Sequence, residues 1–472
     1  MGVAMLLPEV VNVAASEPTE FSTSAEDVVF MQRLDRLVMR LLAKRIRSPR
    51  GFWRFELDLL KLQRDIQAGV TRAKASGTRQ GRHEAKQLQE TLWHAKRLGD
   101  SLAWMLFGPD RRSVDFLSDN EPVPVPPEGD GPRGMVAAAQ AMYPEYGLPL
   151  LHDITDLLRI GDVTFFRPDK RPLTVEMKTA LLDSKTNGRV RKINYRVTAI
   201  WPASDQPPKE VLVPEKLRAR QPALASKRFE RQLKRMSTAH ALVSAEVGKA
   251  TIIDGGPALI VKAQGTSEPS HWSLIRHLVR VAKRTGYASG VADGTTLYIL
   301  LYDPEGLSVK KLPTDRTTYD MANSGILLPD TSRNVINIYS LPDSRGRAPH
   351  RYTPYYLYPL PRTAVLDMLN GRLGIMSVVN LGRVANALEE AGFKVGDLDG
   401  PNLKVFCDVA TSRGKYRVGL PVMNMAIRET IMEAMPLSHL VAIGKATLDG
   451  ITEEFPAVLR DLEATRKQRP TG

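Results

Sequence analysis

The sequence predicts a mixed α/β protein: a helical N-terminal domain, a central mixed sheet flanked by helices, and a smaller C-terminal α+β domain. Three observations lead to this prediction. Apolar residues recur at helical spacing through residues 26–107. Short β-rich runs and amphipathic helical segments then alternate through the middle of the chain. A stretch rich in Pro, Gly and acidic residues separates these two regions, which is typical of an exposed linker.

Composition shifts along the 472 residues suggest where the domains begin and end. A chain of this length suits about three domains of ~150 residues. The expected parts are a loose tail over 1–25, a basic helical domain over 26–113, a Pro/Gly-rich linker over 114–136, a core domain over 137–345 and a C-terminal α+β domain over 346–472.

Three apolar stripes predict three helices in the basic domain. Breaks are expected at Ser48 and Pro49, a capping residue followed by a helix-starting proline, and again over residues 75–81. The stripes consist of Phe30, Leu34, Leu37 and Leu41, then Phe55, Leu59, Leu62 and Ile66, then Leu88, Leu92, Leu98 and Leu102.

The positive charge of the chain is unevenly distributed. The formal net charge is +14, and residues 31–112 contain 19 Lys or Arg against 8 Asp or Glu. A field of this sign attracts polyanions, of which nucleic acid is the commonest. The basic helices could therefore face phosphates. Two alternatives stay open at this point: an ordinary solvated helical face, and a dimerising hairpin in a homo-oligomer.

Several classes of protein do not fit the sequence. No apolar run approaches the ~20 residues that span a bilayer, so no membrane partner is expected. Cys407 is the only cysteine, so the chain cannot form an internal disulfide or a cysteine-rich zinc site. Its position in a strand-like run predicts a buried core thiol. A cytoplasmic location is consistent with this. The chain contains no GxxxxGK[ST], HExxH, CxxC or GxSxG pattern.

The stretch RIGDVTFFRPDKRPLTVEMK, residues 159–178, predicts a β-hairpin. RPDKRP supplies turn residues between strands over 162–167 and 173–178. A turn centred at residue 170 would place Asp162 opposite Lys178 and Thr164 opposite Glu176. Asp162, Glu176 and Lys178 would then project from one face, because side chains alternate along a strand.

Two neighbouring carboxylates and a lysine suit phosphodiester hydrolysis. Asp162 and Glu176 could hold a divalent cation, and Lys178 could orient the attacking water or stabilise the transition state. The alternative is a surface salt bridge on a hairpin. Asp153 and Asp156 lie just upstream and could complete the acidic cluster.

Three further residues could contribute to this site. Asp169 follows a proline, but it lies in the turn and is rejected as a ligand. His152 is expected to be a hydrogen-bonded structural residue in preference to a catalytic one. A later amphipathic helix offers Gln232 beside its apolar stripe. The polar face of this helix carries basic residues that could contact nucleic acid, namely Arg228, Arg231 and Arg235.

These residues resemble the PD-(D/E)xK nuclease superfamily, which has the restriction-endonuclease-like fold. The resemblance consists of Asp162 on one strand, VEMK with Glu176 and Lys178 on the next, and a later helix with Gln232. An apolar strand over 297–302 follows that helix. The wider phrase HDITDLLRIGD resembles bacterial members of the superfamily, some of whose relatives act in defence against foreign DNA.

The resemblance implies a Mg²⁺-dependent endodeoxyribonuclease, with Mn²⁺ as an alternative metal, acting in antiviral defence. Asp162 and Glu176 would bind the metal, Lys178 would assist the attacking water, and Gln232 would lie beside the site. DNA is the expected partner, and a targeting protein could join it. RNA stays an alternative substrate, and a nucleic-acid-binding scaffold with an inactive nuclease fold stays an alternative function.

The sequence departs from the pattern of the superfamily in two places. Ile160 and Gly161 stand where the motif has a proline before the aspartate, a change that the superfamily tolerates. An insert over 181–226 separates the VEMK strand from the helix that carries Gln232, which weakens the assignment of that glutamine more than that of the other three residues.

Overall fold

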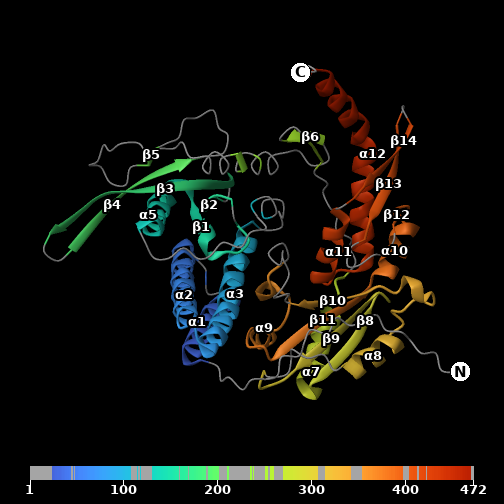
Figure 1. The fold of residues 1–472 in the computed structure, drawn as a ribbon, viewed down its shortest axis with the longest axis horizontal. Helices are drawn as coiled ribbons and strands as arrows, with labels where there is room; N and C mark the ends of the chain where they lie inside the picture. Colours follow the sequence, from blue (N-terminus) through green and yellow to red (C-terminus); the bar gives the residue numbers. More distant parts are fainter. Residues whose placement is uncertain are drawn as a thin grey trace.

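The computed structural model describes residues 24–43, 46, 48–107, 114, 117, 130–158, 160–167, 170–187, 190–200, 210–211, 234–235, 238, 250–253, 256–259, 269–306, 314–341, 353–396, 403–411, 414–420 and 422–468. Helices and several small antiparallel sheets make up this part of the chain (Figure 1). The protein is thus a mixed helix and sheet protein, as the sequence predicts.

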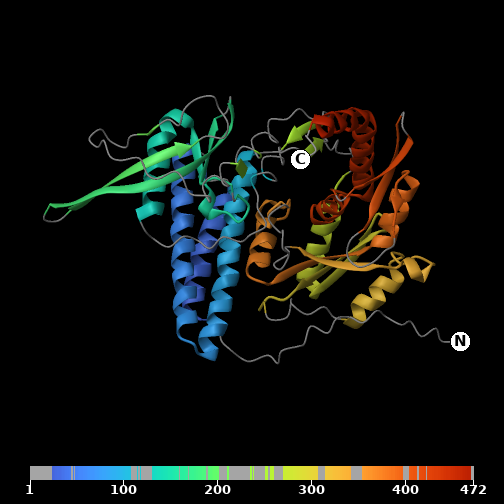
Figure 2. The same cartoon turned by 45° about the horizontal axis from the view of Figure 1, so that its top comes forward.

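Three antiparallel helices form the N-terminal part of the structure (Figures 1 and 2). They are α1 (Ala25–Leu42), α2 (Pro49–Ala75) and α3 (Arg79–Phe107). Ser48 caps α2, and its side chain accepts a hydrogen bond from the backbone of Gly51 at 3.1 Å. The residues of the three apolar stripes are buried, apart from the half-buried Leu92. The predicted helices and both breaks are therefore confirmed.

A five-stranded antiparallel sheet follows these helices in the chain. Its strands are β1 (Leu148–Leu151), β2 (Val163–Arg167), β3 (Lys170–Asn187), β4 (Val190–Ile200) and β5 (Glu210–Val211), in that spatial order. The short 3₁₀ helix η1 (His152–Ile154) follows β1 directly, and α5 (Asp130–Tyr146) packs on the sheet. The distal part of the β3–β4 hairpin projects from the molecule (Figure 2). The helix α5 begins inside the stretch that was expected to be a linker.

A second antiparallel sheet has the strand order β10-β11-β9-β8. Its elements are α7 (Trp272–Thr285), β8 (Tyr287–Ala292), β9 (Thr296–Tyr302), α8 (Thr314–Asn323), β10 (Ile336–Leu341), α9 (Arg362–Leu369) and β11 (Leu373–Asn380). Tyr298 and Leu300 belong to the main core with α7, whereas Ile299 packs with Ile326 after α8, so the two faces of this sheet are both covered.

This second sheet bears on three expectations. The apolar run over 297–302 is a strand, as predicted, but it lies between β11 and β8 and does not pair with the strands of the candidate site. The described strands form separate antiparallel sheets, and the expected central sheet of mixed direction is not found among them. The second sheet also contains strands from both sides of the domain boundary expected between residues 345 and 346. In the chain, β10 lies before that boundary and its partner β11 lies after it.

The last part of the chain forms a third, three-stranded sheet with helices on it. Its elements are α10 (Leu381–Glu390), β12 (Lys394–Val395), β13 (Val405–Thr411), β14 (Gly414–Gly419), α11 (Val422–Met432) and α12 (Leu437–Gln468). Cys407 is buried in its core, as expected. A separate small hairpin pairs β6 (Ala250–Ile253) with β7 (Gly256–Leu259). No helix in the described ranges has the length and apolar character needed to cross a bilayer.

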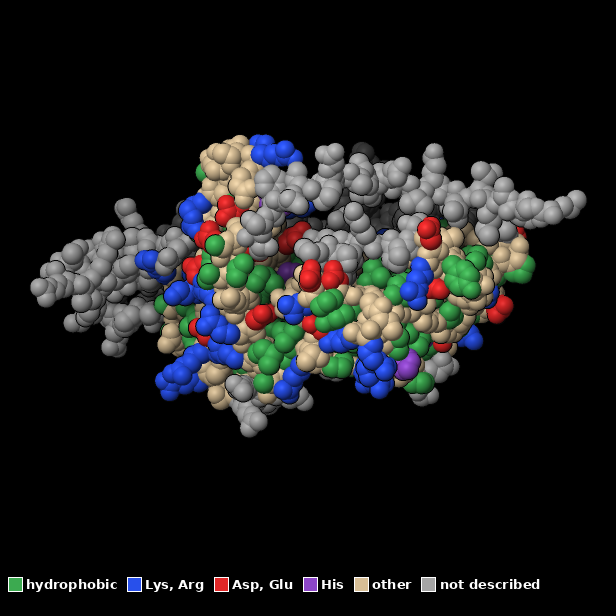
Figure 3. Space-filling model, turned by 90° about the horizontal axis from the view of Figure 1, so that it is seen from below, with side chains coloured by type: hydrophobic (Ala, Val, Ile, Leu, Met, Phe, Trp, Pro, Cys, Tyr) green, Lys and Arg blue, Asp and Glu red, His purple; other side chains and the backbone are tan. Residues whose placement is uncertain are grey.

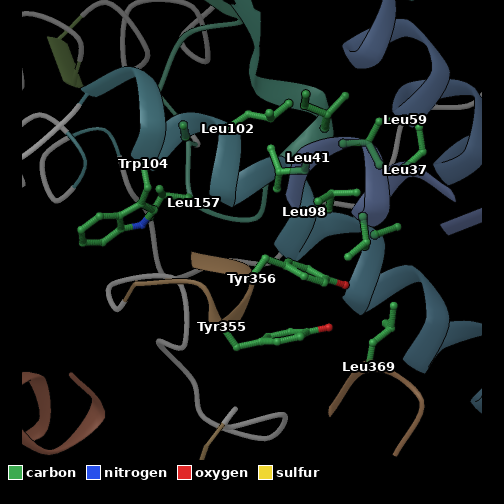
Figure 4. Close-up of a cluster of buried hydrophobic side chains, with 14 of the residues drawn as sticks. Leu37, Leu41, Leu59, Leu98, Leu102, Trp104, Leu157, Tyr355, Tyr356 and Leu369 are labelled. Atoms are coloured by element: carbon green, nitrogen blue, oxygen red, sulfur yellow. The ribbon is translucent and has the colours of Figure 1, made fainter. Parts of the chain in front are cut away.

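One continuous core joins the N-terminal helices to both of the larger sheets. Tyr355 and Tyr356, in a stretch rich in Pro and Tyr over residues 353–361, are buried in this core beside α3 (Figure 4). The Tyr355 hydroxyl lies 2.8 Å from Nδ1 of His94, and the Tyr356 hydroxyl donates to the His94 carbonyl at 3.2 Å. The basic helices therefore do not stand apart from the rest of the fold: residues more than 250 positions later in the chain complete their core.

Candidate functional site

The β2–β3 hairpin places Asp162 beside the part of β3 that contains Glu176. Val163 pairs with Val175, and Thr164 with Thr174. Asp162 directly precedes β2, and its N–H donates to the Val175 carbonyl, so it lies beside the part of β3 that contains Glu176. The next strand, β4, pairs with β3 on its other side, where Glu176 lies opposite Ile200. Glu176 is therefore on an inner strand whose backbone is held on both edges, which fixes the position from which its side chain projects.

The expected pairing of Thr164 with Glu176, and with it that of Asp162 with Lys178, is wrong by two residues. Arg167 pairs with Lys170, so the strands continue further toward the turn than RPDKRP suggests. The ladder is irregular between Phe165 and Arg167, where two residues of β3, including Pro172, oppose one of β2. A bulge needs no ladder N–H from its extra residue, so a proline fits there. A shift of two residues leaves each side chain on its predicted face.

The Asp162 carboxylate is held by the backbone of the opposite strand. Its Oδ2 accepts a hydrogen bond from the backbone N–H of Met177 at 2.6 Å, and the Asp162 N–H donates to the Val175 carbonyl at 2.8 Å. The preceding Gly161 has φ 79°. A Cβ atom at Gly161 would lie 2.6 Å from Cγ2 of Thr174, so only glycine fits this approach. The Asp162 carboxylate thus lies beside the peptide group that follows Glu176.

His152 fixes the segment that leads into Asp162. Its backbone N–H donates to the Asp162 carbonyl at 2.9 Å. In its ring, Nδ1 lies 3.0 Å from the Gly161 carbonyl and Nε2 lies 2.8 Å from Oγ1 of Thr164. Because a carbonyl only accepts hydrogen bonds, Nδ1 carries a proton. His152 is buried and acts as a structural residue, as the sequence interpretation favoured.

The two faces of the hairpin differ in polarity. Val175 and Met177 enter the hydrophobic core on one face. On the other face the hydroxyls of Thr164 and Thr174 lie 2.9 Å apart, and Glu176 follows Thr174 by two residues. The Glu176 residue is 1% exposed, whereas Asp162 is half-buried. Solvent therefore reaches this pair of acids from the side of Asp162.

Lys178 lies two residues beyond Glu176 on β3 and pairs with Thr198 of β4. Residues two apart on a strand share a face, so the backbone places Lys178 on the face of Glu176. Its side chain lies outside the described part of the structure. The one-face arrangement that the sequence predicts is thus compatible with the backbone of β3.

Asp153 and Asp156 lie on the side of α3. The Asp153 carbonyl accepts a hydrogen bond from Lys96, and the Asp156 N–H donates to the Asp100 carboxylate at 2.8 Å. Within the described ranges, no three His, Cys, Asp or Glu side chains are grouped so that they could hold a metal ion. Neither Asp153 nor Asp156 therefore completes such a cluster with Asp162 and Glu176.

Buried polar residues of α2 and α3 hold the loop from η1 toward Asp162. Lys96 is 4% exposed, and its ammonium donates to the carbonyls of Asp153 and of Thr155, the latter at 3.2 Å. The Gln63 amide donates to the Ile154 carbonyl at 2.8 Å. These donors satisfy carbonyls that would otherwise be buried without partners. The N-terminal helices thus hold in place the loop that leads to Asp162.

Asp100 is a second anchor for the same loop. Its Oδ1 accepts hydrogen bonds from the N–H groups of Asp156 at 2.8 Å and Leu157 at 2.9 Å. Its Oδ2 accepts from the Arg97 guanidinium at 3.0 Å. Burial raises the pKa of the Asp100 carboxyl, and the charge of Arg97 opposes that rise. A carboxylate with this many donors is a rigid support for the loop.

The remaining expected site residues belong to the later helix. Arg235 and Lys234 are helical and exposed, and Thr238 is helical and half-buried. Arg228, Arg231 and Gln232 lie outside the described residues, so their approach to the hairpin stays a prediction. The donors that the hairpin offers a metal are the oxygens of Asp162 and Glu176, which are of the hard type that Mg²⁺ prefers.

Sequence reasoning overlooked Gly161. Its positive φ and its contact with Thr174 determine where Asp162 lies. A glycine directly before a candidate acid was the available signal, because glycine adopts φ values that other residues rarely reach.

Comparison with known proteins adds no assignment. The chain matches no protein-family model, and no curated protein or solved structure shows significant similarity to it.

Proposed function

We propose that the protein is a metal-dependent nuclease that hydrolyses DNA phosphodiester bonds at Asp162, Glu176 and Lys178. The observation that carries the proposal is the position of the Asp162 carboxylate beside Glu176 at one end of the hairpin. The Asp162 N–H donates to the Val175 carbonyl, and the Asp162 carboxylate accepts a hydrogen bond from the peptide N–H that follows Glu176. Lys178 follows on the same face of β3.

Each residue has a definite role in this proposal. Asp162 and Glu176 present oxygens to a divalent cation, and Lys178 orients the attacking water or offsets the charge of the scissile phosphate. A bound Mg²⁺ supplies an activated water and stabilises the developing negative charge. The bond from Met177 and the contacts of His152 keep the Asp162 carboxylate in place throughout.

The net charge of +14 favours a polyanionic substrate such as DNA. Asp162 is the accessible member of the acidic pair, so a phosphate would approach from its side. A role in defence against foreign DNA follows only from the family resemblance and is part of the proposal on that basis.

The test is cleavage of supercoiled plasmid with Mg²⁺, Mn²⁺ or EDTA, with a matched RNA as a second substrate. Glu176→Gln and Lys178→Ala should each lower the cleavage rate by about 10²-fold or more, the usual size for such groups. Lys185→Ala is the control, because Lys185 lies further along β3, opposite Lys192 in the same hairpin. Cleavage that persists in both site variants would refute the assignment, and cleavage of RNA alone would reassign the substrate.

The burial of Glu176 favours a second candidate function. Because Glu176 is 1% exposed, a metal or phosphate has little access to its carboxylate in this conformation. A nucleic-acid-binding scaffold with an inactive nuclease fold would have such a closed site. It should bind DNA in a salt-sensitive way and show no metal-dependent turnover, with Glu176→Gln leaving its binding unchanged.

A further inference from the structure

The solvent face of α7 carries a row of arginines. Arg276, Arg280 and Arg284 are all exposed. Their spacing of four residues places them on one side of the helix, about 6 Å apart along its axis. The α7 sequence, WSLIRHLVRVAKRT, contains no acidic residue. The row is thus a linear array of positive charge.

No carboxylate of the described residues pairs with these three arginines. Arg280 and Arg284 use Nε to bond carbonyls of their own helix, at 3.4 Å and 3.2 Å. The neighbouring Lys283 differs, because it forms an ion pair with Asp367 and donates to Thr363 at 3.3 Å. The helix therefore has one cation with an internal role and three that face outward.

The backbone positions of the row are fixed because α7 is firmly packed. The opposite side of the helix is buried against β8 and β9, and Gly286 ends the helix with φ 79°. The buried residues of this side are Trp272, Ile275, Leu278, Val279 and Ala282.

Helix stability explains only part of the row. Cations in the last turn interact favourably with the helix dipole, which accounts for Arg284. Arg276 lies in the first half of α7 and Arg280 before the last turn, where that interaction is weak or absent. The helix dipole therefore gives no reason for an arginine at either of these two positions.

The start of α9 extends the charged surface. Arg362 is exposed, and it precedes Thr363, which Lys283 of α7 contacts. Figure 3, viewed from below, shows groups of Lys and Arg side chains on the face that includes α7 in Figure 1. The α7 face, defined as Arg276, Arg280, Arg284 and Arg362, thus spans two elements.

We propose that the α7 face binds the sugar-phosphate backbone of duplex DNA, separately from the Asp162–Glu176 hairpin. Evenly spaced guanidinium groups on a rigid helix suit a regularly charged polymer, and Arg binds phosphate oxygens with paired N–H groups. Contacts to phosphates position a duplex without reading its sequence. The inference does not require hydrolysis, so it holds for an active nuclease and for an inactive one.

The experiment measures binding of a fluorescent DNA duplex to the full chain in EDTA, over a range of salt concentrations. The test variant is Arg276→Gln/Arg280→Gln/Arg284→Gln. The charge-matched control is Arg333→Gln/Lys394→Gln/Arg417→Gln, whose cations already pair with Glu389 or Asp408. The test variant should bind at least about tenfold more weakly, and its slope of log K against log salt should fall by about 2 to 3. The control should stay within about threefold of wild type.

Two further measurements keep the result decisive. The variant Arg276→Lys/Arg280→Lys/Arg284→Lys retains the positive charge of the row and should bind DNA within about threefold of wild type. Vesicles with and without anionic lipid provide the competing partner. Equal binding and equal salt slopes in the test variant and the control would overturn the proposal. So would a test variant that loses binding to anionic vesicles while it keeps its affinity for DNA.

Discussion

The Asp162 carboxylate and the Met177 backbone N–H are joined by a 2.6 Å hydrogen bond across the β2–β3 hairpin. This bond connects a side chain of the segment before β2 to the main chain of β3, between the two positions assigned to Glu176 and Lys178. It has a structural effect, because it closes the end of the hairpin. It also orients the carboxylate, so the two roles of Asp162 need to be separated by experiment.

Asp162→Asn should separate these roles. An amide oxygen can still accept the Met177 N–H, so the free energy of unfolding should stay close to that of wild type, while metal-dependent cleavage is lost. Asp162→Ala removes the acceptor as well and should cost about 1.5–3 kcal/mol, the range for a hydrogen bond to a charged group. Urea denaturation and plasmid cleavage report the two effects, and full activity in the Asn variant would contradict the metal-binding role.

Gly161→Ala tests the approach of this segment to β3. A methyl group would meet Cγ2 of Thr174 at 2.6 Å, on a residue with φ 79°. Gly294→Ala is the matched control, since Gly294 has φ 63° and no atom within 4 Å of the added Cβ. The control should cost about 1 kcal/mol for the backbone alone, and Gly161→Ala about 1–3 kcal/mol more. Equal losses in thermal denaturation would show that Thr174 moves aside freely.

Glu56 of α2 should make stability fall as pH rises. It is fully buried, with one oxygen accepting from the Leu151 N–H at 3.0 Å and no hydrogen-bond partner for the other in the described ranges. Burial raises the pKa of this carboxyl well above its ordinary value of 4.5. Above pH 4.5, Glu56 of the unfolded chain loses its proton, whereas Glu56 of the folded chain keeps it. Stability is therefore lost at up to about 1.4 kcal/mol per pH unit until the folded pKa is passed.

The substitution that checks this is Glu56→Gln, which keeps the acceptor for Leu151 and cannot ionise. Its advantage over wild type in urea denaturation should be small near pH 4 and should grow toward pH 8. Glu305→Gln, at an exposed carboxyl, is the control and should show no such growth. A Glu56→Gln advantage that does not change with pH would rule out the buried proton.

Gly99→Ala tests the support that α3 gives to the candidate site. A Cβ at Gly99 would lie 1.9 Å from the Ile154 carbonyl oxygen, which is backbone and cannot rotate away. At Gly69 of α2 the nearest atom is a Leu88 methyl at 3.1 Å, which can move. Alanine favours helix by about 1 kcal/mol over glycine, so Gly69→Ala should be neutral or stabilising.

Gly99→Ala should instead lower the melting temperature and reduce any cleavage activity together, because the loop before Asp162 is displaced. Unchanged cleavage in a Gly99→Ala protein that is clearly destabilised would show that this support does not reach the site.

The helices were predictable because their signals are local. The stripe of Leu34, Leu37 and Leu41 reports the period of the helix, and Ser48 with Pro49 reports its start. The β-hairpin was predictable for the same reason. Its register was not, because a proline usually ends a strand, whereas at Pro172 the strand continues through a bulge.

The supports of the site were not predictable from pattern. Lys96 and Asp100 lie on a basic helix, where charged residues are normally assigned to solvent, yet both are buried. Their partners are backbone groups of residues 153–157, more than 50 positions away. The sheet of the 297–302 strand was missed on similar grounds, since its partner β11 lies about 75 residues later and strand pairing leaves no local signal.

The burial of Tyr355 beside His94 has a consequence for synthesis. The pair is separated by 261 positions, so the N-terminal helices leave the ribosome long before the tyrosines that complete their core. At ~5–20 residues per second, that interval lasts on the order of 10 to 50 s. During it the aromatic surface of α3, including Trp93, lacks its partner ring. A nascent chain that stalls before residue 355 should therefore recruit chaperones or aggregate, whereas the released chain should not.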